Sequence, residues 1–240
     1  TYHYLVTASN SSGETNDSNI ASAQLPATDP SIWNGGTMAA WAHGARIAFP
    51  GYTNSETLSN IPLLVRLDAT NVPGFNHSQL AFANGADLRF TDSAGSTELA
   101  YEIEKWDPAG TSLLWVNVPS LTNTTRILAF WRHPAAPAPA SNGAAWTGGY
   151  TGVWHLNSTT VTDSTATPQN STSNATLTSS GKVASALVHN GSSQHTIIPN
   201  ATELNLSKNY ELSGWFKLAA ADKPAISFLF RWAIVRYTSE

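Results

Sequence analysis

The chain has 240 residues, a formal net charge of −4 and no cysteine, and only 12% of its residues are charged. The missing cysteines exclude disulfides, thiol catalysis and cysteine-based zinc sites. The mild acidic charge, without any Lys/Arg run, argues against nucleic acid as a partner. No apolar stretch approaches the roughly 20 residues that a membrane span needs.

Asn, Ser and Thr supply most of the polarity, and these residues favour turns and strands over helix interiors. We therefore predict an all-β chain of β-sandwich or jelly-roll modules with little helix. At the N-terminus, Tyr2, Tyr4 and Val6 alternate with other residues, as in a half-buried strand. A polar loop and a second strand, "IASAQLPA", follow. Two strands alone are marginal in water, so we expect them to belong to a larger module.

The pattern Tyr-x-Tyr-x-Val-x-Ala-x-Asn-x-x-Gly-Glu-Thr, followed by "IASAQLPA", resembles the last two strands of a fibronectin type III domain. The resemblance implies that residues 1–29 are the C-terminal strands of such a domain, and that its earlier strands precede this sequence.

Residues 30–134 contain a denser series of short strand candidates, separated by Pro/Gly and Asn/Gly turns, as in a sandwich or jelly roll. The candidates are 61–68, 86–92, 98–107, 112–119 and 125–131. The stretches "IPLLVRLD", "GADLRFTDSAG", "LAYEIEKWD", "LLWVNVPSL" and "RILAFWRHPAA" resemble the bacterial domain DUF2341. That resemblance implies a β-sandwich in large exported bacterial proteins, with no established chemistry.

Residues 135–148 are rich in Ala and Pro and predict a semi-rigid linker. Beyond it, "GVWHLNS", "GKVASALVHNG" and "SGWFKL" resemble the opening of a concanavalin A-like, laminin G-type jelly roll. The resemblance implies that residues 149–240 form part of such a module. Its unpaired strand edges would need cover, so we expect residues 150–240 to contribute strands to a shared sheet, with the central sandwich or in a homo-oligomer.

The stretch "YEIEKWD" contains a candidate catalytic pair. On a strand, Glu102 and Glu104 share one face at roughly 6.5–7 Å, within the range of about 6.5–9.5 Å found in inverting glycosidases. Asp107 or Glu98 would assist them. The alternative interpretation is a solvated acidic face opposite a core face.

The nine Trp residues suggest a binding function. Sugar rings stack on exposed indoles, and nearby polar side chains bind the hydroxyls. Trp115, Trp131 and Trp215 lie in apolar strands, and we expect them in the core. The predicted ligand-binding residues are Trp106, Asp107, Trp33 and Trp146.

No cofactor is required by any motif, and no histidine pair has metal-ligand spacing. The laminin G-type resemblance implies a structural Ca²⁺ bound by Asp, Asn and backbone oxygens. Asp163 and Asn157 are the candidate ligands, with Asn170 and Asn190 as further ones. Ordinary Asx turns are the alternative.

Together these patterns predict a non-catalytic accessory region of a large secreted or cell-surface bacterial protein. Its expected partner is a polysaccharide or another cell-surface polymer. A glycoside hydrolase using Glu102 and Glu104 is the first alternative, and a structural or adhesive spacer is the second.

Overall fold

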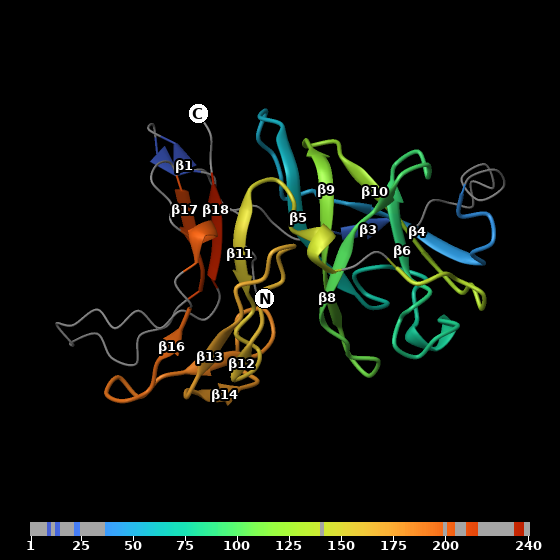
Figure 1. Cartoon of the computed structure of the whole chain (residues 1–240). Helices are drawn as coiled ribbons and strands as arrows, with labels where there is room; N and C mark the ends of the chain where they lie inside the picture. The colour runs from blue at the N-terminus through green and yellow to red at the C-terminus, as the bar shows by residue number, and fades with distance from the viewer. Residues whose placement is uncertain are drawn as a thin grey trace. The chain divides into compact units, whose positions relative to one another are not determined.

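The computed structural model describes residues 9–10, 13–14, 22–24, 37–139, 142–198, 201–204, 210–215 and 233–237. The chain divides into two units, Thr1–Ser141 and Asn142–Glu240 (Figure 1). Antiparallel strands build both units. The helical elements of the described part are three 3-10 turns, η1 (His77–Gln79), η2 (Asn142–Ala145) and η3 (Thr202–Leu204). The all-β prediction is confirmed.

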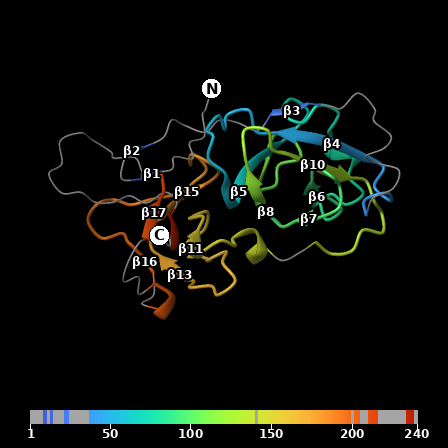
Figure 2. The same ribbon diagram turned by 90° about the horizontal axis from the view of Figure 1, so that it is seen from above.

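The first unit is a sandwich of two antiparallel sheets. One sheet has the order β3-β4-β10-β6-β7 and the other has the order β5-β9-β8. Figure 2 shows β4 and β10 running together in the first of these sheets. The strands are β3 (Ser22–Gln24), β4 (His43–Ala48), β5 (Leu58–Leu67), β6 (Arg89–Asp92), β7 (Glu98–Leu99), β8 (Tyr101–Lys105), β9 (Ser112–Leu121) and β10 (Arg126–Trp131).

The core lies between these two sheets because successive side chains of a strand point to opposite faces. In β9, Leu114, Val116 and Val118 are buried in the core, and their register partners in β5 are Val65, Leu63 and Ile61. The other sheet contributes side chains from β4, β6, β7 and β10 to the same cluster: Ala45, Ile47, Phe90, Leu99, Ile127, Ala129 and Trp131.

The outer face of the β5-β9-β8 sheet is also buried at β9. Trp115 and Asn117 alternate with the core residues and are both buried. The expectation of a buried core position is confirmed for Trp131, which lies between the two sheets, and for Trp115, which is buried on the opposite face of β9. Trp215 is half-buried, with the ammonium of Lys182 5.0 Å from its ring centre.

All five strand candidates of the central segment form strands, whereas β4 had no predicted counterpart. The sandwich also recruits a strand from before its predicted start at residue 30, because Ser22–Gln24 pairs with Arg46–Ala48 of β4. The predicted strand at residues 2–8 lies outside the described residues. A short hairpin of β1 (Ser9–Asn10) and β2 (Gly13–Glu14) follows it.

The second unit contains three small antiparallel sheets, ordered β11-β18-β17, β12-β13-β16 and β14-β15. Its strands are β11 (Tyr150–Trp154), β12 (Thr160–Val161), β13 (Ser171–Ser173), β14 (Thr176–Thr178), β15 (Ala186–Val188), β16 (Thr196–Ile197), β17 (Tyr210–Ser213) and β18 (Ala233–Tyr237). A small core gathers around Trp154, Val161 and Leu187. The described strands of this unit pair only with one another, so the expectation of a sheet shared with the central sandwich is wrong for this part of the chain.

Within the described ranges, no helix has the length and apolar character needed to cross a bilayer.

Candidate functional site

Trp106 follows β8 and is held at the surface of the first unit by two contacts. Its indole Nε1 donates a hydrogen bond to the main-chain oxygen of Ala83 at 2.7 Å. Its six-membered ring lies against Gly85, where an added Cβ would be 2.5 Å from Trp106 Cη2. Gly85 also has φ +76°, a left-handed conformation that favours glycine. The half-buried indole therefore has a fixed orientation and keeps part of its surface exposed.

A second aromatic side chain belongs to the same turn. Phe82 is 37% exposed, and its main-chain oxygen accepts a hydrogen bond from the Gly85 amide at 2.9 Å. Ala83, the acceptor for Trp106, is the next residue. The 82–85 turn therefore presents one exposed aromatic side chain and anchors another, which was not expected from the sequence.

His77 connects Trp106 to the interior of the unit. The His77 ring contacts Trp106 edge-on at 5.3 Å between ring centres, and it contacts Phe75 in the same way at 4.9 Å. His77 Nε2 is 2.9 Å from the hydroxyl oxygen of Ser112, which is fully buried at the start of β9. The same oxygen accepts the amide N–H of Asp107 at 2.9 Å. Ser112 thus joins His77 to the backbone beside Trp106.

Charged groups surround this aromatic cluster. Lys105 Nζ forms an ion pair with Asp107 Oδ2 at 2.8 Å, and the hydrogen bond from Lys105 lowers the pKa of the Asp107 carboxyl. Burial would raise the pKa of Asp68, but hydrogen bonds from Thr111, Asn71 and the Thr70 amide outweigh it, and the pKa is lowered. We call Phe82, His77, Lys105, Trp106 and Asp107 the Trp106 site.

Burial lowers the pKa of His77, against the opposing effect of the Asp107 and Asp68 carboxylates. At neutral pH the site therefore combines the Lys105–Asp107 ion pair with a neutral imidazole, and the Asp68 carboxylate lies nearby. A rigid indole with hydrogen-bonding groups at its edge can stack on an uncharged ring and bind its hydroxyls.

The predicted carboxylate pair lies elsewhere on β8. Glu102 is paired in register with Trp115 of β9 and is only 6% exposed. Glu104 Oε2 accepts the indole N–H of Trp115 at 2.9 Å. Glu102 and Glu104 therefore both neighbour Trp115, although the pairing register of β8 with β9 shifts at Glu104.

A third polar group, the Asp87–Arg89 cluster, is buried under the start of β6 and was not predicted. The Asp87 carboxylate is inaccessible to solvent and accepts main-chain N–H groups from two separate segments. The donors are Ala81 at 2.9 Å, Phe82 at 3.2 Å, Arg132 at 2.7 Å and His133 at 3.3 Å.

Arg89 is also almost fully buried, and main-chain oxygens surround its guanidinium. It donates to Ala86 at 2.9 Å, to Leu88 at 2.6 Å and to Pro137, and forms an ion pair with Glu98 at 3.1 Å. Pro137, in the predicted linker, is therefore attached to the sandwich.

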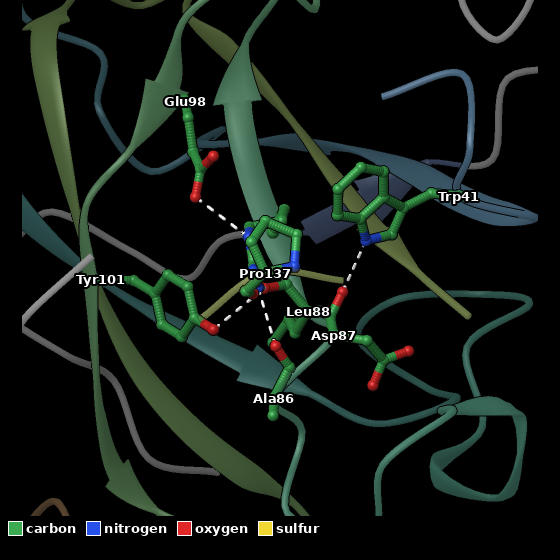
Figure 3. Close-up of polar contacts among 8 residues, drawn as sticks. Trp41, Ala86, Asp87, Leu88, Glu98, Tyr101 and Pro137 are labelled. Atoms are coloured by element: carbon green, nitrogen blue, oxygen red, sulfur yellow. Dashed lines mark hydrogen bonds and ion pairs between the residues drawn. The ribbon is translucent and has the colours of Figure 1, made fainter. Parts of the chain in front are cut away.

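Figure 3 shows Trp41 and Tyr101 reaching the backbone of Asp87 and Leu88, and beside them Glu98 forms its ion pair with Arg89. Trp41 Nε1 donates to the Asp87 oxygen at 2.6 Å, and the Tyr101 hydroxyl donates to the Leu88 oxygen at 2.9 Å. These contacts tie loops and strands of the first unit together, so we assign the cluster a structural role. The signal in the sequence was the pair of charged residues inside the apolar stretch "GADLRF".

The remaining predicted site residues are dispersed. Trp33 lies outside the described residues. Trp146 is only 3% exposed, packed against Tyr150 and His155, so the expectation that it lies at the surface is wrong. Asn157 is exposed.

Asp163 is buried and accepts three main-chain N–H groups. The donors are Val153 at 2.9 Å, Thr165 at 3.0 Å and Gln169 at 2.8 Å, while the Asp163 amide donates to Asn170 Oδ1 at 3.0 Å. The described residues contain no group of three or more His, Asp or Glu side chains that could hold a metal ion. Calcium binding at Asp163 and Asn157 stays a prediction, and the contacts present are those of a backbone-binding carboxylate.

Residues 84–147 match the family model of DUF2341, a domain of unknown function. No curated protein and no solved structure matches the chain. The matched segment contains the Asp87–Arg89 cluster, both carboxylates of β8, and Trp106 with its supporting Gly85.

Proposed function

We propose that the first unit is a non-catalytic binding module for a carbohydrate or another surface polymer, and that the Trp106 site is its binding surface. The observation that carries this proposal is the rigid, half-exposed indole of Trp106, fixed by the 2.7 Å hydrogen bond to Ala83 and by its packing on Gly85. An aromatic ring that is already oriented loses little conformational freedom when a sugar stacks on it.

The charges at this surface favour an uncharged polymer. Asp107 is paired with Lys105, and the remaining carboxylate, Asp68, is occupied by hydrogen bonds from its own loop and from Thr111. No excess positive charge is present at the Trp106 site to attract uronic acids or sulfated sugars. We therefore expect neutral glycans such as cellulose, chitin or xylan to bind better than polyanionic ones.

The test is a pull-down of the full chain on insoluble cellulose, chitin and xylan. Trp106→Ala should abolish retention, because it removes the stacking surface. Leu177→Ala is the matched control, since Leu177 is an exposed apolar residue of the second unit, 48% exposed. Equal retention of both variants on every polymer would refute the binding role of Trp106.

Glycoside hydrolysis is the second candidate, and one observation favours it. Glu102 is the register partner of Trp115, and Glu104 accepts the indole N–H of the same residue. Release of reducing sugar by the wild type, lost in Glu102→Gln and in Glu104→Gln, would support an enzyme. A chain that neither binds nor cleaves these polymers would leave the structural or adhesive spacer.

The wider setting is also a proposal. The resemblances to DUF2341, to fibronectin type III strands and to a concanavalin A-like opening support a region of a large exported bacterial protein. Zero cysteines are compatible with that setting, because modules that form a sufficient core need no disulfides. Pairing of the second unit with another copy of the chain is tested by the oligomeric state in solution.

A further inference from the structure

We propose that the hydrogen bond between Ser112 and His77 positions the Trp106–Asp107 turn, and that protonation of His77 releases this turn and weakens ligand binding in acid. The inference rests on the proposed function where ligand binding is concerned. The positioning itself can be measured without any ligand.

The direction of the hydrogen bond follows from the surroundings of Ser112. Its oxygen is fully buried and already accepts the Asp107 amide N–H, so the hydroxyl hydrogen needs an acceptor of its own. Within the described part of the chain, His77 Nε2 is the other atom in hydrogen-bond contact with it. Ser112 therefore donates to Nε2, and His77 is neutral with its proton on Nδ1.

Protonation of His77 reverses this arrangement. An imidazolium is a donor at both nitrogens, so Ser112 would face two N–H donors while its own hydrogen lost its acceptor. A buried hydroxyl hydrogen without an acceptor destabilises this arrangement. The hydroxyl must turn away from His77 or the histidine must move, and either change disturbs the support of the Asp107 amide.

The groups that face His77 determine the pH at which it becomes protonated. Phe75 contacts the His77 ring from the loop before η1, and Trp106 contacts it from the segment after β8. Both aromatic rings exclude water from the imidazole, which opposes its charged form. The carboxylates of Asp107 and Asp68 favour the charged form from the loops after β8 and β5. Burial is the larger effect, and the pKa of His77 lies below its ordinary value of 6.5. The transition therefore falls on the acidic side of neutrality.

Trp106 would report the change directly. Its ring touches the His77 ring, and its backbone precedes the amide that Ser112 holds. Nuclear magnetic resonance of the full chain between pH 4 and pH 8 can follow the His77 ring protons. The same spectra follow the indole N–H of Trp106, assigned with the Trp106→Phe variant. We expect both signals to move with one midpoint, below 6.5.

Two variants separate positioning from simple packing. His77→Gln provides a carboxamide oxygen that can accept from Ser112 but does not titrate, so the Trp106 signal should become independent of pH. Ser112→Ala removes the donor that favours neutral His77, so the His77 midpoint should rise and the Trp106 signal should no longer follow it. A Trp106 signal that stays constant while His77 titrates, or that keeps its pH dependence in His77→Gln, would overturn the proposal.

Polymer binding gives the second readout. Loss of one hydrogen bond of about 1 kcal/mol corresponds to a roughly fivefold loss of affinity. We expect retention on the bound polymer to fall by about that factor across the His77 transition, and to stay constant in His77→Gln. If the Trp106 and His77 signals move together but no polymer binds, the positioning role stands and the proposed function fails. If the polymer binds with the same affinity through the transition, the regulatory role fails.

Discussion

Asp87 and Arg132 are joined by a 2.7 Å hydrogen bond from main-chain amide to carboxylate, although 45 residues separate them in the chain. The same carboxylate accepts the amides of Ala81 and Phe82. One buried side chain therefore fixes the segment after β10 to the turn that carries Phe82 and leads to Gly85. Through that turn, the structural cluster under β6 also supports Trp106.

Asp87→Asn should destabilise the first unit by about 2–4 kcal/mol, because the carboxamide directs an NH₂ group at buried main-chain donors. Urea unfolding monitored by fluorescence measures the loss. Asp92→Asn at the end of β6 is the control, since that carboxylate accepts the Ser96 amide in an exposed turn. We expect a loss below about 1 kcal/mol there. Equal losses in the two variants would contradict the role assigned to Asp87.

Gly85→Ala should displace Trp106 as well as strain the backbone. The left-handed conformation alone costs about 1–2 kcal/mol for a residue with a Cβ, and overlap with the indole adds about 1–3 kcal/mol. Gly95→Ala is the matched control, because Gly95 has φ +73° but its added Cβ would meet only Leu128 at an ordinary 3.7 Å. Only Gly85→Ala should shift the Trp106 indole resonance. An unchanged resonance would show that the packing on Gly85 does not hold the ring.

Tyr101 should make the first unit sensitive to alkali. Burial raises the pKa of its hydroxyl to about 12 from an ordinary 10.0. The folded state therefore holds this proton more tightly than the unfolded chain. The resulting stabilisation is complete below pH 10 and is lost as the pH rises toward 12, by roughly 3 kcal/mol in all.

Denaturant unfolding at several pH values measures this loss, and Tyr101→Phe should remove the Tyr101 part of it. The variant should also lose about 1 kcal/mol at neutral pH, because the hydrogen bond to Leu88 is absent. If the variant kept the full alkaline dependence, another group would be responsible.

Asp163→Asn should lower the stability of the second unit equally in calcium and in EDTA. Its carboxylate oxygens already accept three main-chain N–H groups, so the expected loss of about 1–3 kcal/mol comes from mismatched hydrogen bonds. Thermal unfolding with and without the metal distinguishes the two roles. A melting temperature that calcium raises in the wild type and not in the variant would establish a calcium site instead.

The strands of the central sandwich could be predicted because their alternation and turn residues agree with the pleat. The strand β4 could not be predicted in this way. Its sequence, "HGARIA", has Ala and Gly at positions where larger apolar residues would show the two-residue alternation of a strand. In β9, both faces are buried, and an apolar run hides which side chains face the core. The sequence therefore predicts that Trp115 is buried but does not show that it lies on the face opposite Leu114 and Val116.

The candidate site was only partly visible in the sequence. Trp106 and Asp107 directly follow the acidic strand candidate, and the polar residues next to them in the sequence indicate a position at the surface. His77 and Ser112 are 35 residues apart and meet only because the η1 turn packs beside the first residue of β9. In the sequence, Gly85 is an ordinary turn residue, and only the folded structure shows that the Trp106 indole packs against it. Contacts of this kind depend on the tertiary fold rather than on local pattern.

The pairing of Ser22–Gln24 with β4 has a practical consequence for dividing this chain. A fragment that starts at residue 30, where sequence patterns place the start of the sandwich, would leave the main-chain N–H and C=O groups of Arg46–Ala48 without their strand. Exposed strand edges of this kind pair with other chains. Such a fragment should therefore be prone to self-association, and recombinant production of the first unit should begin upstream of Ser22.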